Sequence, residues 1–187
     1  MTSTTQIQNA GDVVAFLKAQ QDQVKTAFED VLSASGSERE RAFVTLRQML
    51  AVHETAEELI VHPHARRQIP NGEQIVDARL AEEHDAKEAL TALEKLDVDS
   101  TEFVTQFDKL HSDVLAHAKA EEQEEFAKLE TGLGADELDR MRRAVERAEA
   151  LAPTRPHAGI ESRAANALVG PFAAMLDRAR DALFAPK

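Results

Sequence analysis

Most of the chain consists of long runs in which apolar residues recur at steps of three and four, the spacing that lines one face of an α-helix. Short stretches such as S-A-S-G-S and I-P-N-G interrupt these runs, and we expect helices to stop there. Pro63 disfavours helix at the residue before it, so His62 and His64 are expected in an exposed loop. The predicted helices span about 12–32, 37–61, 73–96, 100–129, 135–151 and 160–184.

The first four of these helices are long, and short connections join them. Short connections favour antiparallel neighbours, and Ala, Leu, Glu, Lys and Arg, which favour helix, are abundant. We therefore predict an all-α fold, an antiparallel up-down-up-down four-helix bundle over residues 12–131. Residues 132–187 are predicted to form a C-terminal helical extension that packs on the bundle or on a dimer partner.

Polar residues occupy positions on the apolar faces of these helices. In helix 37–61 the apolar register runs into His53 and Glu57, and in helix 100–129 it runs into His117 and Glu121. Each pair is four residues apart, so its imidazole and carboxylate are neighbours on one face. Burying such groups costs several kcal/mol unless something compensates them. On helices 12–32 and 73–96 the polar residues are Gln21, His84 and, at the edge of the face, Glu88.

These polar residues could bind metal. They recur at nearly equal intervals along the chain, so a bundle that reverses at each loop can bring them to one level. The chain has no cysteine, and imidazole with carboxylate suits iron, manganese or zinc. One buried His–Glu pair is more often a simple hydrogen-bonded pair. Two such pairs with His84 between them favour a metal centre, and the several carboxylates favour one with two metals.

The remaining polar neighbours are expected to be less important. Glu54 and Glu58 are predicted to face solvent, and His111 to be a surface or packing residue. His157 is expected to begin the C-terminal extension rather than to supply a metal ligand.

Charge and termini narrow the choice of partners. The net charge of −12 argues against general binding to nucleic acid or to an anionic membrane, since both need a basic surface. The N-terminus lacks the pattern of a signal peptide, and no apolar run is long enough to span a bilayer. A cytoplasmic protein is expected.

Three stretches together resemble the hemerythrin-like, HHE cation-binding domain proteins: H-E-T-A-E (53–57), E-E-H-D-A-K-E (82–88) and H-A-K-A-E (117–121). The resemblance covers about residues 12–130. It implies a four-helix bundle that holds two non-haem irons, bridged by two carboxylates and an oxo or hydroxo group. By the same resemblance Glu57 and Glu121 would bridge, His84 and His117 would bind one iron, and His53 would bind the other.

The chain departs from this family pattern at two positions. Gln21 stands where the family has a histidine, and an amide oxygen is a weaker ligand, so the iron beside His53 is expected to be bound loosely or to keep an open position. Glu88 stands where oxygen-carrying hemerythrins have the second histidine of His-x-x-x-His. A further carboxylate favours the ferric state, which argues against reversible oxygen carriage.

Three functions are compatible with the sequence. The first is a non-haem di-iron protein that binds, senses or detoxifies O2, H2O2 or NO. The second is an oxidase or peroxidase-like enzyme that acts on an organic substrate at the open position near Gln21. The third is a one-metal or metal-free bundle that works through protein association, for example as a homodimer formed by its C-terminal helices.

Overall fold

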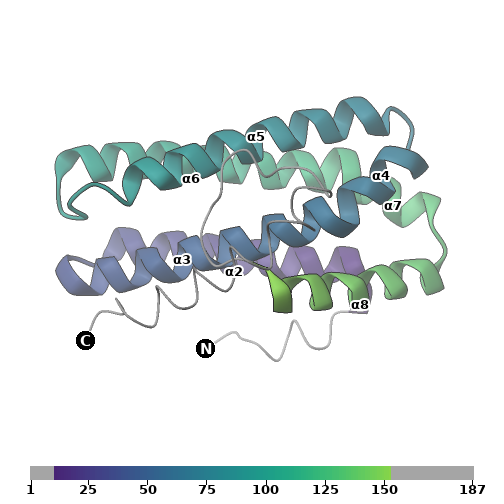
Figure 1. Ribbon diagram of the computed structural model, residues 1–187, viewed down its shortest axis with the longest axis horizontal. Coiled ribbons are helices and arrows are strands. Elements are labelled where there is room, and N and C mark those ends of the chain that lie inside the picture. The colour runs from purple at the N-terminus through teal and green to yellow at the C-terminus, as the bar shows by residue number, and fades with distance from the viewer. Residues whose placement is uncertain (1–10, 153–187) are drawn as a thin grey trace.

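The computed structural model describes residues 11–152, which form helices and connecting turns without a strand (Figure 1). The prediction of an all-α fold is confirmed. The predicted helix at 160–184 and His157 lie outside the described residues. The elements are α2 (Val13–Ser33), α3 (Gly36–Ala56), η1 (Glu57–Val61), α4 (His62–Gln68), α5 (Gly72–Leu93), α6 (Thr101–Ala120), η2 (Glu121–Phe126), α7 (Ala127–Gly132) and α8 (Ala135–Leu151).

The elements form a bundle of four antiparallel rods with one further helix. The rods are α2, then α3–η1–α4, then α5, then α6–η2–α7, and each runs opposite to the one before it (Figure 1). The fifth helix, α8, packs against α2, α3 and η1 on the outside of the bundle. Within residues 11–152, no helix is both long and apolar enough to cross a membrane.

Local sequence explains where several helices begin. The Asp12 carboxylate accepts a hydrogen bond from the Ala15 N–H at 3.0 Å, and the Ser100 hydroxyl accepts one from the Phe103 N–H at 3.1 Å. Both satisfy backbone donors that a helix N-terminus leaves free. The turn between α4 and α5 requires Gly72, because a Cβ there would lie 2.3 Å from the carbonyl oxygen of Ala65.

The prediction that the second helix ends near Val61 is wrong. The rod continues through Pro63 to Gln68, because a π-helical turn, η1, precedes α4 and Pro63 falls in the first turn of α4. A first-turn residue needs no intrahelical N–H donor, so proline is tolerated there. The exposed loop predicted at His62 and His64 is therefore helical.

The bundle core has two apolar clusters. One lies at the end formed by Val14, Leu17, Val61, Phe126 and the buried face of α8, and the other contains Phe28, Phe43, Leu90, Phe103 and Phe107. Along each rod, polar residues separate the positions that belong to one cluster from those that belong to the other. We call these residues the polar layer: Gln21, His53, Glu54, Glu57, Glu58, His62, Arg79, Glu83, Lys87, Glu121 and Glu125, all of them buried.

Candidate metal centre

A π-helical turn starts at the carboxylate of each of the two pairs His53–Glu57 and His117–Glu121. η1 begins at Glu57 and η2 begins at Glu121. A π-turn holds more residues than an α-turn and therefore widens the face that points inward, and such turns are frequent at functional sites. In η1 it brings Glu58 to the interior beside Glu57, with exposed fractions of 3% and 0%. In η2 it likewise buries Glu125 together with Glu121.

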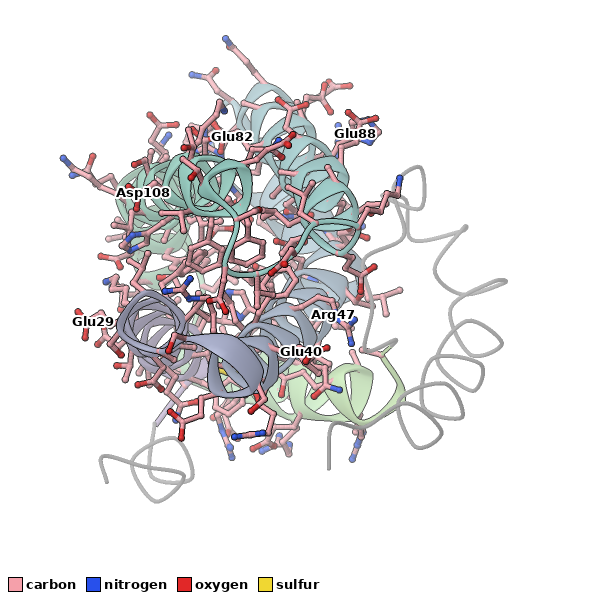
Figure 2. All side chains as sticks on the ribbon, turned by 90° about the vertical axis from the view of Figure 1, so that its left-hand side faces the viewer. Glu29, Glu40, Arg47, Glu82, Glu88 and Asp108 are labelled. Carbon is pink, nitrogen blue, oxygen red and sulfur yellow. The ribbon has the colours of Figure 1, made fainter. Side chains whose placement is uncertain are left out.

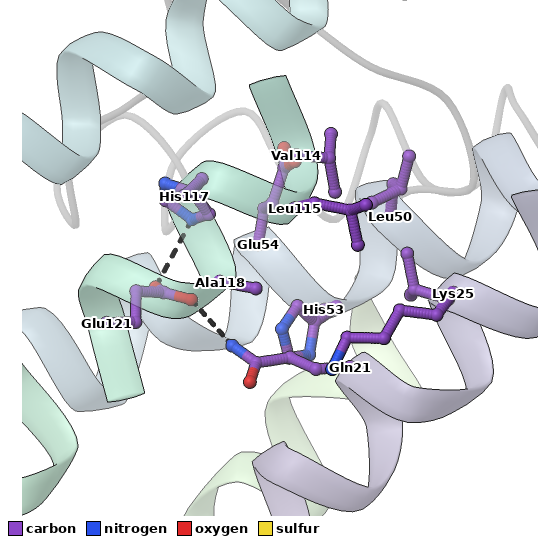
Figure 3. A pocket seen from close by; sticks show the side chains of 11 residues that line it. Gln21, Lys25, Leu50, His53, Glu54, Val114, Leu115, His117, Ala118 and Glu121 are labelled. Atoms are coloured by element: carbon purple, nitrogen blue, oxygen red, sulfur yellow. Dashed lines mark hydrogen bonds and ion pairs between the residues drawn. The ribbon is translucent and has the colours of Figure 1, made fainter. Parts of the chain in front are cut away.

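The first cation group consists of His53, Glu57 and Glu121. Each offers one donor atom, and these three atoms lie within 4.8 Å of one another. The Nε2 atom of His53 lies 3.3 Å from a Glu57 carboxylate oxygen. From α2, the side-chain amide of Gln21 donates a hydrogen bond to Glu121 at 2.8 Å (Figure 3). The group draws on two rods of the bundle, and Gln21 adds a contact from a third.

The second cation group consists of His62, Glu83 and Glu121, whose donor atoms also lie within 4.8 Å of one another. His62 lies 2.6 Å from Glu83 through Nε2 and 3.0 Å from Glu125 through Nδ1. Because Glu121 belongs to both groups, its carboxylate lies between the two positions. Two cations bound there would share it.

In both of these pairs, a side chain of a neighbouring helix contacts the Nδ1 atom of the histidine. His53 Nδ1 lies 3.0 Å from the Gln20 side-chain oxygen, and His117 Nδ1 lies 2.8 Å from a Glu82 carboxylate oxygen. If each Nδ1–H donates to its oxygen, the lone pair is on Nε2. In His117 this Nε2 lies 3.3 Å from Glu121 (Figure 3). A metal-ligating histidine typically donates its other N–H to such a carbonyl or carboxylate.

Charged residues that belong to neither cation group line the same layer. Lys87 donates a hydrogen bond to Glu58, and both are buried. Arg79 donates to Glu82 at 2.8 Å, so an ion pair supports the carboxylate behind His117. The prediction that Glu54 and Glu58 face solvent is wrong, since their exposed fractions are 4% and 3%.

Burial shifts the acid–base properties of these side chains. It raises the pKa of Glu57 well above its ordinary value, and the neighbouring Glu121 charge raises it further. Burial also raises the pKa of Glu54 to about 8. Around His62, burial by itself would lower the imidazole pKa, but Glu125 and Glu83 outweigh it and hold that pKa well above 6.5. Without a cation, the layer retains protons that most surface carboxyls release.

The donors fit a bound cation. Both carboxylate oxygens of Glu57, one of Glu83 and the amide oxygen of Gln21 are buried and accept no hydrogen bond from the described residues. Partnerless buried carboxylate oxygens are rare and costly in a folded protein. Oxygen and imidazole nitrogen donors without thiolate suit iron, manganese or zinc. A divalent cation in this layer would supply the missing positive charge.

The structure brings together five of the residues predicted as metal ligands: Gln21, His53, Glu57, His117 and Glu121. It does not bring His84 or Glu88 to them. His84 lies 3.4 Å from Glu88, with side chains 41% and 65% exposed, and Figure 2 shows Glu88 on the outer side of the bundle. The register of α5 differs by one residue from the predicted one, so Glu83 faces the interior in place of His84.

Besides Glu54 and Glu58, sequence reasoning missed further buried residues of the layer, among them His62, Glu83 and Glu125. His62 was expected to be exposed, yet its exposed fraction is 2%. A usable signal was present in E-E-H and E-E-Q-E-E, where adjacent glutamates leave open which one faces inward. His111, expected at the surface or in packing, stacks on Phe28 with ring centroids 4.6 Å apart.

A small cavity adjoins the first cation group. Its volume is about 20 Å³, and His53, His117, Glu121 and Gln21 are among the residues that line it (Figure 3). About 10–15 Å³ on this measure holds one water molecule. The cavity therefore has room for a molecule of about two heavy atoms at most.

Comparison with known proteins agrees with this geometry. A family model described as the hemerythrin HHE cation binding domain matches residues 12–129. A similar solved structure is the crystal structure of a hemerythrin HHE cation binding domain-containing protein, the Rv2633c homolog from Mycobacterium kansasii. It has a TM-score of 0.65 and 17% sequence identity, and the match covers 74% of this chain and 88% of that one. At this identity the structural likeness concerns the fold. No curated protein sequence gives a significant match.

Proposed function

The chain belongs to the hemerythrin HHE cation-binding family, and on this premise we propose that it is a non-haem di-iron protein that reacts with O2, H2O2 or NO. One observation carries the proposal. Two groups of imidazole and carboxylate donors overlap at Glu121, deep between two apolar clusters, and several of their oxygens lack partners. A pair of cations that share a carboxylate accounts for this arrangement.

The chain's own residues would divide the work. His53 and Glu57 would hold one iron and His62 and Glu83 the other, with Glu121 shared between them. His117 lies one helical turn before Glu121, with its Nε2 atom 3.3 Å from the Glu121 carboxylate. Bound iron would supply the electron transfer to the oxidant. The surrounding bundle excludes bulk water, and Gln20 and Glu82 hold the imidazoles in place.

The size of the small cavity supports the proposal that the reactant is a small molecule. The cavity is lined by His53, His117 and Glu121 and has room for a molecule of about two heavy atoms at most. O2, H2O2 and NO all have two heavy atoms. The cavity therefore favours binding, sensing or detoxification of such a molecule.

A second cavity favours the alternative, an oxidase or peroxidase-like enzyme with an organic substrate. Its volume is about 330 Å³, and it opens between α2 and α3 beside His53. A volume of this size is at the lower end of ligand pockets. All its lining side chains are uncharged or imidazole: Gln20, Gln23, Val24, Gln48, Met49, Val52 and His53. A neutral organic molecule is the substrate class that this lining suits.

Anaerobic loading of the cation-free protein with Fe(II) tests the proposal. We expect two irons per chain, and we expect their absorption spectrum to change on addition of O2, H2O2 or NO. Only trace iron, with an unchanged melting temperature, would refute it and favour protein association instead. An organic substrate would be consumed only in the enzyme case, and Val52→Trp, which fills the larger cavity, should then slow its consumption.

Gln21 provides a further check on the assignment. Gln21→His should tighten binding of the iron beside His53 if Gln21 faces that position. An unchanged iron affinity would remove Gln21 from the ligand set. A cytoplasmic location and a homodimer through the C-terminal helices stay predictions.

A further inference from the structure

Helix α8 reaches His53 through one intermediate side chain. The side-chain amide of Gln20 on α2 donates a hydrogen bond to the Glu149 carboxylate on α8 at 2.7 Å. The oxygen of the same amide lies 3.0 Å from His53 Nδ1 on α3. Neither Glu149 nor Gln20 belongs to a cation group, yet both are connected to a residue that does.

The chemistry of the three groups fixes where the protons are. The amide nitrogen of Gln20 can only donate and an ionised carboxylate can only accept, so Glu149 determines which way the amide points. The amide oxygen that then faces His53 can only accept, so the imidazole carries its proton on Nδ1. The lone pair is left on Nε2, the nitrogen 3.3 Å from the Glu57 carboxylate.

Packing alone does not hold this amide. Gln20 lines the larger cavity together with Gln23 and Gln48, whose amides can offer both donors and acceptors. If Gln20 turned over, its NH2 group would face Nδ1, and the imidazole would move its proton to Nε2. That nitrogen would then be closed to a cation.

We propose that Glu149 is a positioning residue that selects the His53 tautomer with a free Nε2, so that the imidazole is prepared for a cation before one binds. The apolar face of α8, with Leu138, Met141 and Val145 in the bundle core, fixes the helix that carries Glu149. The role in cation binding rests on the proposed function. The choice of tautomer does not, because it concerns the protein without a cation.

The test is ¹⁵N NMR of the histidine side chains in the cation-free full-length protein at pH 7. In the wild type, His53 should be protonated at Nδ1. In Glu149→Lys, residue 149 donates instead of accepting, so the His53 proton should shift largely to Nε2. Glu146→Lys makes the same charge change one turn earlier on α8, where Glu146 pairs with Arg142, and should leave the tautomer unchanged.

A rescue variant separates positioning from simple damage. Gln20→Glu in the Glu149→Lys background places a carboxylate next to His53 and a lysine behind it, which should restore protonation at Nδ1. If Glu149→Lys does not fold, Glu149→Ala should still give a mixture of the two tautomers. An unchanged tautomer in both folded variants, or no restoration by Gln20→Glu, would overturn the inference.

Metal titration then links the tautomer to the proposed function. Glu149→Lys should weaken Fe(II) binding about 10- to 100-fold, the usual effect of losing a side chain that orients a metal ligand. Unchanged affinity despite a shifted tautomer would overturn the role of Glu149 in cation binding. If the wild type itself binds no metal while the tautomer responds as expected, the proposed function fails and tautomer selection stands.

Discussion

The turns that contain His53–Glu57 and His117–Glu121 share one sequence pattern and one internal distance, 3.3 Å, yet they hold protons differently. Burial lowers the pKa of His53 to about 4 and raises that of Glu57, so this pair tends to be uncharged. Burial acts on His117 in the same direction, but Glu121 and Glu82 outweigh it and hold its pKa well above 6.5. Burial would raise the Glu121 pKa, but His117 outweighs it, so that pair is ionic.

The groups behind the two imidazoles contribute to this difference. His53 faces the neutral amide of Gln20, whereas His117 faces the Glu82 carboxylate, which Arg79 supports in turn. A carboxylate makes its imidazole more basic than an amide does. An identical His-x-x-x-Glu motif can therefore occur in two charge states within one layer, and the side chain that contacts the imidazole Nδ1 helps to decide which.

The largest loss of iron binding is expected at the carboxylate that the two cation groups share. Glu121 belongs to both cation groups and Glu57 to one. Glu121→Gln should abolish binding of both irons. Glu57→Gln should weaken binding of the iron beside His53 by more than about 100-fold, which is more than the loss of a side chain that only orients a metal ligand usually causes. Iron counting and isothermal titration measure both. Glu88→Gln is the matched control and should bind iron normally, because Glu88 lies at the surface. Loss of both irons in Glu57→Gln alone would contradict the division into two groups.

A second comparison tests His62, which the sequence did not predict as a ligand, against His84, which it did. His62→Ala should weaken the second cation position about 100-fold, because among the described residues this imidazole is the nitrogen donor of that group. His84→Ala should leave affinity unchanged, since His84 is partly exposed and pairs with Glu88. Fe(II) titration of both variants measures the two affinities and shows which histidine is the ligand. The opposite ranking would restore His84 as a ligand and contradict the geometry of α5.

The sequence alone predicted part of the polar layer correctly and missed the buried face of α5. The apolar register identified both His-x-x-x-Glu pairs, because each continues a face that is otherwise Leu, Val and Phe. On α5 the buried face contains Arg79, Glu83 and Lys87, which look like surface residues until their partners on other helices are known. The bundle and its family resemblance are confirmed.

His62 was missed for a different reason. Pro63 normally signals the end of a helix, and no local sequence rule predicts a π-turn that lets the helix start again. The turn depends on tertiary packing of Glu57 and Glu58 into the layer, which no single helix specifies.

A smaller loss of affinity should follow when the two histidines, His53 and His117, are given the same kind of Nδ1 partner. Glu82→Gln places an amide behind His117, as Gln20 is behind His53. The pKa of His117 should fall, and Fe(II) affinity should fall about 10-fold. NMR titration of His117 in the cation-free protein measures the first change and calorimetry the second. Glu122→Gln, the same change at a half-buried position of η2 outside both cation groups, serves as the control. A His117 pKa that does not move would show that Glu121 alone sets the charge of this pair.

The smallest effect concerns the stability of the cation-free protein. Burial raises the pKa of Glu54 and Glu58 from 4.5 to about 8, so between these pH values the folded protein keeps protons that the unfolded chain has released. The free energy of unfolding should therefore fall as pH rises through this window, by about 1.4 kcal/mol per pH unit for each proton. His53, with its lowered pKa, acts in the opposite direction only below 6.5.

The fall should therefore be clearest between pH 6.5 and about 8, and urea unfolding across that range measures it. Glu54→Gln should flatten the slope because it removes one of the retained protons. Saturating metal should reverse the slope, because a cation competes with protons for the same oxygens and binds better as pH rises. A slope that is the same with and without metal would mean that the cation does not bind in the polar layer.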